Sequence, residues 1–404
     1  MRRPPLLACL PALLPGLLGL SVLASLLVAP PAHAAGDAWR GTGGDIEIVG
    51  RGYGHGHGMS QWGAQGAAKQ GLSSREIVEF YYPGTEAGRV GGRIGVLITA
   101  DTSDQLTVLP RKKLRARAVE SGRTVELDRD GVRLWRMRTD KRGRTRVASL
   151  PQGASQKGGW EKRAVFAGPG EFDARNRPVK LVLPGGERPY RGRLRGVDTG
   201  GGALDTVNRL RLEDYLRGVV PREVPALWEP AAVQAQAIAA RTYAAYERAH
   251  PRSSTHHTCD TTSCQVYGGV ADEHPAADAA IAETARQVRT ADGEPAFTQF
   301  SSSSGGWTSQ GSRDYLPAQK DPYDGWDGNP VHRWSATVPA AAVERAWPAV
   351  GSLRSIEVVA RDGQGQWGGR ATRVRVVGTA GERTVTGPEL RFALGLRSEW
   401  LAFR

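Results

Sequence analysis

The sequence predicts an α+β fold in which mixed β-strands are combined with a long alanine-rich helix. Three observations support this class. Short apolar runs of β-type alternate with turns over residues 91–200. Glycine, at 52 of 404 residues, is nearly twice as frequent as its usual share of about 7%, which indicates many turns. The clearest helical pattern begins near residue 230 and is rich in alanine.

The composition, with 40% apolar and 24% charged residues, allows a sizeable buried core. At ~150 residues per domain, the length corresponds to two or three domains. We expect one main domain with a β-rich subdomain. Along the chain, the expected segments are a signal peptide at 1–34, a Gly-His-Gly motif segment that packs on the main domain at 35–90, a β-rich basic subdomain at 91–200, and the core at 201–404.

The first 34 residues have the pattern of a cleaved export signal. Arg2 and Arg3 precede a long apolar stretch, and Ala32-His33-Ala34 supplies the small residues that a signal peptidase requires. Prolines interrupt the stretch, so an uncleaved anchor is the less favoured alternative and no stable membrane span is expected. We therefore expect a secreted, cell wall-associated protein. The net charge of +13 favours an anionic partner, and export favours wall polymers over nucleic acid.

Several further elements follow from local patterns. The N-terminal segment is expected to contain a strand at 46–49, a glycine-rich turn and a helix at 60–69. The last hundred residues return to strands at 356–359 and 373–377 and are expected to end with a helix. The start of that helix, Thr386-Gly387-Pro388-Glu389, is a capping box with proline in the first turn. In the β-rich subdomain, strands are expected at 94–98, 106–109, 132–135 and 181–183.

Positive charge is concentrated in residues 111–146, which contain 14 Lys or Arg and 5 Asp or Glu. One interpretation is the solvated face of a β-hairpin. The other is a docking patch for anionic wall polymers, whose affinity would fall steeply with salt.

A helix is predicted from about Pro230, where the missing N–H of proline costs nothing. Its narrow apolar face contains Val233, Ala237, Ala240 and Ala244.

A neighbouring stripe of this helix contains Gln234 and Arg241. Polar side chains that are buried need partners. A polyol substrate is one partner that would satisfy them.

Glu223 lies just before this helix, between Val220-Pro221 and Val224-Pro225. The prolines stiffen the turn, and the apolar neighbours would partly desolvate the carboxyl group. Desolvation raises a carboxyl pKa, as a general acid near neutral pH requires. The alternative is an ordinary surface glutamate near a helix start.

The stretch from Leu212 to Tyr246 resembles the core of the stage II sporulation protein D family (SpoIID/LytB-like). The resemblance rests on Tyr215-Leu216, Gly218-Val219-Val220, Glu223, Pro225, Trp228, Ala235-Gln236-Ala237 and Ala239-Ala240-Arg241-Thr242-Tyr243. Three more blocks are similar to the family, namely Cys259 to Gly269, Phe300 to Trp307 and Gly54 to Ala64. Together the blocks cover most of the chain from about residue 45.

The order of one block differs from the family pattern. In family members the GHGxGMSQ block follows the C-terminal strand and helix, whereas here it precedes everything else. A circular permutation explains this order, and it requires residues 35–90 to pack beside residues 385–404.

The resemblance implies a lytic transglycosylase that cleaves peptidoglycan glycan strands between N-acetylmuramic acid and N-acetylglucosamine. Glu223 would act as the single acid and base and produce 1,6-anhydro ends, and no cofactor would be required.

The resemblance also implies substrate-binding residues around Glu223. Histidines of the glycine-rich turn are expected to line the cleft, to serve a structural turn or, less favoured, to bind a metal. The expected set is Arg241, Gln299, Ser302, Ser303, Gly305, Gly306, Trp307, His55 and His57.

Relatives in the sporulation branch of the family hold a zinc ion in the loop that matches residues 256–264. Cys259 and Cys264 match, but Ser263 stands where a histidine is expected, and His256 and His257 lie upstream. A disulfide, a structural zinc ion and free thiols all remain open.

Two other functions compete with the transglycosylase. A non-catalytic wall-binding protein could enhance an N-acetylmuramoyl-L-alanine amidase, as other members of the broad family are described to do. A metal-dependent hydrolase that uses the His/Cys loop is a weaker alternative.

Overall fold

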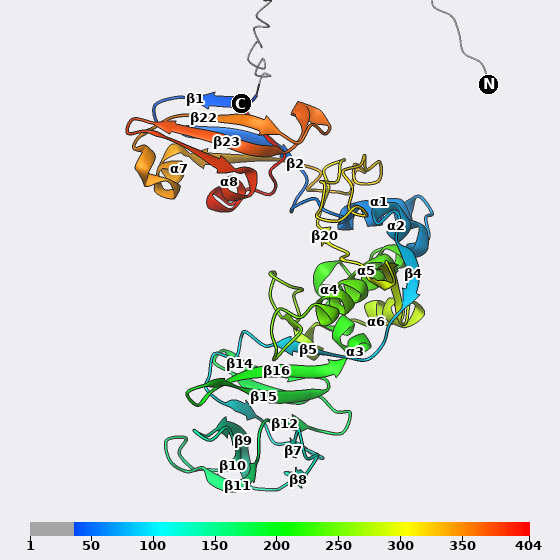
Figure 1. Ribbon diagram of the computed structural model, residues 1–404, viewed down its shortest axis with the longest axis vertical. Helices are drawn as coiled ribbons and strands as arrows, with labels where there is room; N and C mark the ends of the chain where they lie inside the picture. Colours follow the sequence, from blue (N-terminus) through cyan, green and yellow to red (C-terminus); the bar gives the residue numbers. More distant parts are fainter. Residues whose placement is uncertain (1–35) are drawn as a thin grey trace, which may run out of the picture. The chain divides into compact units, whose positions relative to one another are not determined.

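The computed structural model describes residues 36–404, so the expected signal peptide at 1–34 lies outside the described residues. The chain combines helices and sheets as the α+β prediction requires, and β-structure dominates (Figure 1). No helix within residues 36–404 has the length and apolar character needed to cross a membrane.

Two sheets, formed mainly by residues 93–211, pack on a shared core. The six-stranded sheet has the order β11 (Glu161–Phe166), β10 (Thr145–Pro151), β9 (Val132–Thr139), β6 (Leu106–Val108), β13 (Val179–Leu183) and β14 (Gly186–Tyr190). The seven-stranded sheet has the order β17 (Thr258–Cys259), β5 (Arg93–Leu97), β16 (Ala203–Arg211), β15 (Arg193–Gly200), β12 (Gly170–Asp173), β7 (Arg115–Ala118) and β8 (Thr124–Glu126). The β15–β16 hairpin continues the strand structure beyond residue 200.

The basic residues of 111–146 are divided between these two sheets. Arg115 and Arg117 belong to β7 of the seven-stranded sheet, whereas Arg136 and Arg138 belong to β9 of the six-stranded sheet. At the turn of the β9–β10 hairpin, Asp140 accepts hydrogen bonds from the side chain of Arg144, which lower its pKa. The segment is therefore not one continuous strand face.

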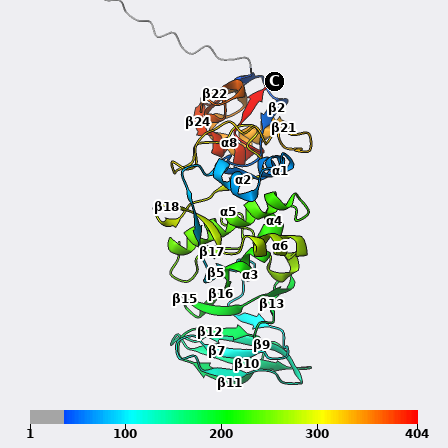
Figure 2. The ribbon, with the colours of Figure 1, turned by 90° about the vertical axis from the view of Figure 1, so that its right-hand side faces the viewer.

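The long helix is α5 (Pro230–Ala249), which begins at the predicted proline. Its predicted apolar face is buried in the core that these two sheets share, together with residues of α3 (Leu212–Arg217) and α6 (Pro275–Glu283). Ala235 and Ala239, on another face, pack with α1 (Gln61–Lys69) and α2 (Ser74–Tyr81). Figure 2 shows α5 between these two groups of helices. Small alanine side chains allow this close approach on both sides.

The first and last described strands belong to a third group of elements. A four-stranded sheet has the order β1 (Ala38–Arg40), β22 (Leu353–Arg361), β23 (Ala371–Gly378) and β24 (Glu382–Thr386), and a three-stranded sheet has the order β21 (Arg333–Pro339), β2 (Asp45–Arg51) and β25 (Leu401–Phe403). Helices α7 (Ala340–Ala346) and α8 (Gly387–Leu394) pack against β22 and β23, as Figure 1 shows.

The pairing of β2 with β25 places residues 48–50 beside residues 401–403, so part of the N-terminal segment lies beside the C-terminal segment, as the permuted order requires. The prediction that the chain ends with a helix is wrong, because β25 follows α8. Leu401 and Phe403 of this strand are buried. The strand also pairs with an edge of β2 whose backbone groups would otherwise be left unpaired.

Short strands complete the connection between these groups. β3 (Met59–Ser60) pairs in parallel with β20 (Phe300–Ser301). β4 (Glu86–Arg89), β18 (Gln287–Ala291) and β19 (Glu294–Pro295) form a separate sheet.

The predicted capping box is present at the start of α8 and provides a test of local stability. Thr386 Oγ1 accepts a hydrogen bond from the Glu389 N–H, and the Glu389 carboxylate accepts one from the Thr386 N–H. We expect Thr386→Ala to lower the free energy of unfolding by about 1 kcal/mol in chemical denaturation. Thr386→Ser keeps the hydroxyl and should retain most of the stability; equal losses in both variants would contradict the role of the cap.

Candidate active site

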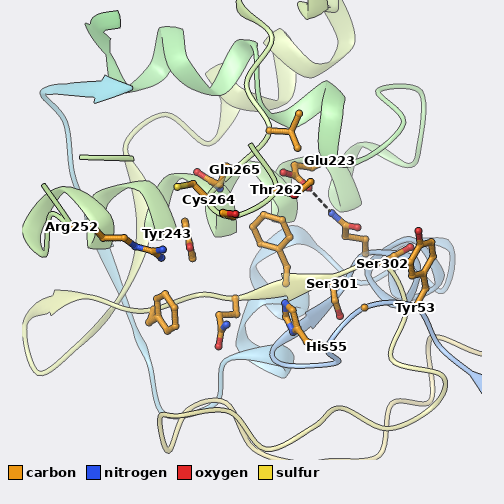
Figure 3. Close-up of a pocket in the computed structure, with 17 residues that line it drawn as sticks. Tyr53, His55, Glu223, Tyr243, Arg252, Thr262, Cys264, Gln265, Ser301 and Ser302 are labelled. Carbon is orange, nitrogen blue, oxygen red and sulfur yellow. Dashed lines mark hydrogen bonds between the residues drawn. The ribbon is translucent and has the colours of Figure 1, made fainter. Parts of the chain in front are cut away.

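Glu223 is positioned by a short, proline-stiffened turn of helix. Helix α4 (Val220–Glu223) follows α3 after Gly218 and Val219 and has Pro221 in its first turn. Val220 and Val224 are buried against the core on either side of this turn. The carboxyl group of Glu223, the last residue of α4, is directed into a pocket (Figure 3).

The pocket has a volume of about 470 Å³ and is formed by segments that are far apart in the sequence. Six segments contribute: the glycine-rich turn, the first residue of α1, the end of α4, the C-terminal part of α5 with the residues after it, the disulfide loop, and the segment around β20. The lining residues are Tyr53, Gly54, His55, Gln61, Glu223, Tyr243, Arg252, Thr262, Ser263, Cys264, Gln265, Val266, Phe297, Gln299, Phe300, Ser301 and Ser302. Within residues 36–404, Glu223 is the single carboxylate in this lining.

The Glu223 carboxyl group is largely withdrawn from water. This burial raises its pKa from 4.5 to about 7, even though hydrogen bonds from Gln61 and the Val266 backbone and the charge of Arg222 favour the ionised form. Gln61 Nε2 donates to Glu223 Oε2 over 3.3 Å. The desolvation expected from the local sequence is therefore present, and a group with this pKa can both give and take a proton near neutral pH.

Sequence reasoning did not assign a role to Gln61, although the residue lies within the GHGxGMSQ block. Ser60 caps the N-terminus of α1 by accepting a hydrogen bond from the Gly63 N–H, which leaves Gln61 as the first residue of the helix. One sequence signal could have indicated a role for Gln61: it is a glutamine that directly follows a serine N-cap, in a motif that the sequence analysis had already linked to the site.

The two histidines of the glycine-rich turn lie in different surroundings. His55 lines the pocket, and its Nδ1 accepts a hydrogen bond from the His57 N–H at 3.0 Å. Burial, together with the charge of His57, lowers the pKa of His55 to about 3, so the imidazole is neutral. His57 lies outside the pocket lining, with its Nδ1 3.3 Å from the Ser309 carbonyl. Of the two histidines, His55 alone belongs to this pocket lining, and a cleft role for His57 stays a prediction.

The serine-glycine turn is only partly in the pocket. Gln299 and Ser302 line it, and so does Ser301. Ser303 is fully buried and donates to Asp324 at 2.8 Å, so its hydroxyl is already satisfied by the protein. The predicted cleft position of Ser303 is wrong for this reason.

Gly305 and Gly306 also lie outside the pocket. The Gly305 N–H donates to Asp324 Oδ2 at 3.0 Å, and the Gly306 N–H donates to Ser304 Oγ at 3.1 Å. Gly305 has a φ of +74°, and a Cβ there would lie 2.7 Å from the Gly52 backbone nitrogen. These glycines permit a tight turn around Asp324 rather than an approach of substrate.

Trp307 is likewise absent from the pocket lining. Its backbone carbonyl accepts a hydrogen bond from Arg370 at 3.1 Å, and it pairs with Lys320 in an isolated bridge. A cleft role for Trp307 stays a prediction, and the aromatic residues that line this pocket are Tyr53, Tyr243, Phe297 and Phe300.

Arg241 is a structural residue. Its side chain is fully buried and forms an ion pair with Glu213 at 2.8 Å. It also donates to the backbone carbonyls of Ile281 and Gln287. The prediction that Arg241 faces substrate is wrong, because protein groups satisfy the guanidinium. The cation that lines the pocket is Arg252, which sequence reasoning missed.

The two cysteines of the loop at 256–264 form a disulfide, one of the three alternatives that the sequence left open. Cys259 and Cys264 are joined, with their Cα atoms 5.5 Å apart. His257 Nδ1 accepts a hydrogen bond from the Gly95 N–H, and His256 Nδ1 lies 2.9 Å from Thr255 Oγ1. No group of three or more His, Cys, Asp or Glu side chains within residues 36–404 is arranged to hold a metal ion. With both sulfurs bonded to each other, these residues do not fit a tetrahedral zinc site.

The comparison with protein families matches residues 200–290 to the SpoIID model, described as stage II sporulation protein. This range holds Glu223, α5 and the disulfide loop. This part of the chain is therefore similar to the SpoIID family.

Similar proteins come from several bacteria. The amidase enhancer of Bacillus subtilis is 39% identical over 121 residues, which is 28% of this chain and 16% of the enhancer. Stage II sporulation protein D of Bacillus subtilis is 44% identical over 54 residues, covering 13% of this chain and 16% of that protein. An uncharacterized protein of Brachyspira hyodysenteriae is 37% identical over 103 residues, covering 25% and 28% of the two chains. These matches span less than a third of each relative.

The raised pKa of Glu223 predicts a pH-dependent stability. Because its folded pKa of about 7 lies above its ordinary value of 4.5, folding binds a proton between these limits, and the stability contributed by the protonated group is lost as pH rises through 7. Glu223→Gln cannot ionise. We expect its free energy of unfolding to equal that of the wild type near pH 4. At pH 8 the free energy of unfolding of the variant should be about 1–3 kcal/mol higher than that of the wild type. Denaturant titrations of both proteins at the two pH values measure this difference, and a constant difference across pH would contradict it.

The assignment of Arg241 as a structural residue predicts a loss of stability on its removal. Arg241→Ala leaves carbonyl groups unpaired and a cavity, so we expect the free energy of unfolding to fall by about 2–4 kcal/mol. Arg373→Ala, at an exposed position of β23, should change it by less than about 0.5 kcal/mol. An Arg241→Ala protein of unchanged stability would contradict this assignment.

Proposed function

We propose that this protein is an exported lytic transglycosylase that cleaves peptidoglycan glycan strands. The observation that carries the proposal is a single carboxyl group, Glu223, held in a pocket with a pKa of about 7. A group with this pKa serves as acid in one step and as base in the next.

In the proposed reaction, protonated Glu223 gives its proton to the glycosidic oxygen between N-acetylmuramic acid and N-acetylglucosamine. The bond from muramic C1 to this oxygen breaks, and C1 gains oxocarbenium character. The Glu223 carboxylate then takes the proton of the muramic C6 hydroxyl while C6 oxygen bonds to C1. The products are a 1,6-anhydro end and a free 4-hydroxyl, and Glu223 is protonated again.

The count of carboxylates favours this reaction over hydrolysis. Glycosidases that use water generally need a second carboxylate as nucleophile or base. Within residues 36–404, the pocket lining offers none besides Glu223. The C6 hydroxyl of the substrate replaces water, so one carboxyl group suffices.

The neighbouring residues have separate proposed roles. Gln61, which donates to Glu223 Oε2, is a positioning residue for the carboxyl group. His55, Gln299 and Ser302 supply polar atoms for sugar hydroxyls and acetamido groups. The pocket aromatics provide flat apolar faces on which a pyranose ring can lie.

A second candidate function is supported by one comparison. The similarity to the Bacillus subtilis amidase enhancer favours a wall-binding protein that turns over no glycan and assists an N-acetylmuramoyl-L-alanine amidase. In both cases the proposed location is the cell wall, and the proposed partners are glycan strands and anionic wall polymers.

The experiment that tests the proposal is mass spectrometry of purified glycan strands after incubation with each protein. We expect the wild type to release fragments with 1,6-anhydro ends and Glu223→Gln to release at least about a hundredfold less, since general acid–base catalysis contributes ~10²–10⁴-fold.

Glu382→Gln, at an exposed position of β24, is the matched control and should keep full activity. Reducing ends would indicate hydrolysis and overturn the transglycosylase. An inactive wild type that accelerates an added amidase would establish the second candidate instead.

A further inference from the structure

One face of the seven-stranded sheet is rich in arginine. Strand register places these side chains in adjacent rows of the same face, because alternate residues of a strand point to the same side. The intervening residues Leu194, Leu210 and Phe172 are buried in the core. We name this surface the arginine face, and its arginines are Arg93 of β5, Arg209 and Arg211 of β16, Arg193 and Arg195 of β15, and Arg115 and Arg117 of β7.

Four of these arginines already have acidic partners within the sheet. The buried carboxylate of Glu171 accepts hydrogen bonds from Arg117, Arg193 and Arg195 at 2.8–3.0 Å. Asp173 forms an ion pair with Arg115 at 2.7 Å. This part of the arginine face is neutralised by the protein itself.

The remaining three arginines lack such partners. Arg93, Arg209 and Arg211 form no ion pair with any residue of the range 36–404. Arg93 stands directly opposite Arg211 in the antiparallel β5–β16 pair. Like charges in directly opposed positions destabilise a sheet unless an anion lies between them.

Arg93 and Arg211 also line a cavity of about 630 Å³. Arg115 lines the same cavity, and its Nε is buried without a hydrogen-bond partner. The cavity is further lined by Arg175, Asn176, Arg191, Gly192, Arg193, Asp173 and Asp214. Guanidinium groups therefore surround this space from several strands, and part of their hydrogen-bonding capacity is unused.

We propose that this cavity is a binding site for the phosphate groups of an anionic polymer of the phosphodiester class. Tetrahedral phosphate presents oxygens in several directions, so it can accept hydrogen bonds from guanidiniums that arrive from different strands. A carboxylate has only two oxygens, both in one plane, and the carboxylates of this face are already engaged by arginines of β7 and β15. A polymer with a repeating phosphate would hold the protein at the wall while a different region acts on glycan.

This inference does not depend on the proposed catalysis, because Glu223 lies in a different pocket from the arginine face. Polymer binding and glycan cleavage can therefore be lost separately.

The test measures binding of poly(glycerol phosphate) to the full chain by fluorescence anisotropy at low salt. We expect the double variant Arg93→Gln with Arg211→Gln to bind at least about tenfold more weakly, since charge-assisted hydrogen bonds to both residues are lost. The matched control is Arg354→Gln with Arg373→Gln, which removes the same charge from exposed positions of β22 and β23 and should change affinity less than about twofold. Glu223→Gln should bind like the wild type.

Two further measurements distinguish a specific site from a general charge effect or a folding defect. The polymer should raise the melting temperature of the wild type and not that of the Arg93/Arg211 variant, whose own melting temperature should be no lower than that of the wild type. Polyglutamate should bind more weakly and should not respond to the two substitutions. The proposal would be overturned if both double variants lost the same affinity for poly(glycerol phosphate). It would also be overturned if the Arg93/Arg211 substitutions weakened polyglutamate binding by the same factor.

Discussion

The burial of one carboxyl group is the constraint on which the candidate site depends. Glu223 ends a single turn of helix whose proline and flanking valines leave its side chain few directions, and the pocket withdraws it from water. Gln61 and the Val266 backbone compensate part of this cost and orient the carboxylate. The result is a proton donor and acceptor that the protein obtains from packing, with one neutral amide side chain as its partner.

That packing needs residues from both ends of the described chain. β2 is held between β21 and β25, and the chain that follows β2 carries Tyr53, His55 and Gln61 into the pocket. The parallel pairing of β3 with β20 joins this segment to the pocket-lining segment around β20. Asp324 accepts hydrogen bonds from Ser60, which follows the first segment, and from Ser303, which follows β20, so one buried carboxylate links the two segments.

Local signals predicted the elements well. Proline at the start of α5, the capping box of α8 and the apolar alternation of strands such as β9 all depend on neighbouring residues, and the structure has them where the sequence predicts. The desolvation of Glu223 was predictable for the same reason. The element missed at the C-terminus, β25, is three residues long and is defined by its partner strand.

The polar side chains were predicted less well, because their partners come from tertiary structure. Arg241 and Ser303 have the chemistry of substrate ligands, but Glu213 and Asp324 satisfy them inside the protein. Gln61 reaches Glu223 across 162 positions of sequence. A single sequence shows that such a residue is polar, and only the fold shows whether its partner is protein, solvent or ligand.

The position of β2 has a consequence for the order of assembly during synthesis. Both neighbouring strands are made long after β2: β21 begins at Arg333, and β25 is the last strand of the described residues. While the chain emerges from a ribosome or a translocation channel, the turn with His55 therefore has no completed sheet to support it. A site supported in this way is completed only when β25 has been made and has paired with β2.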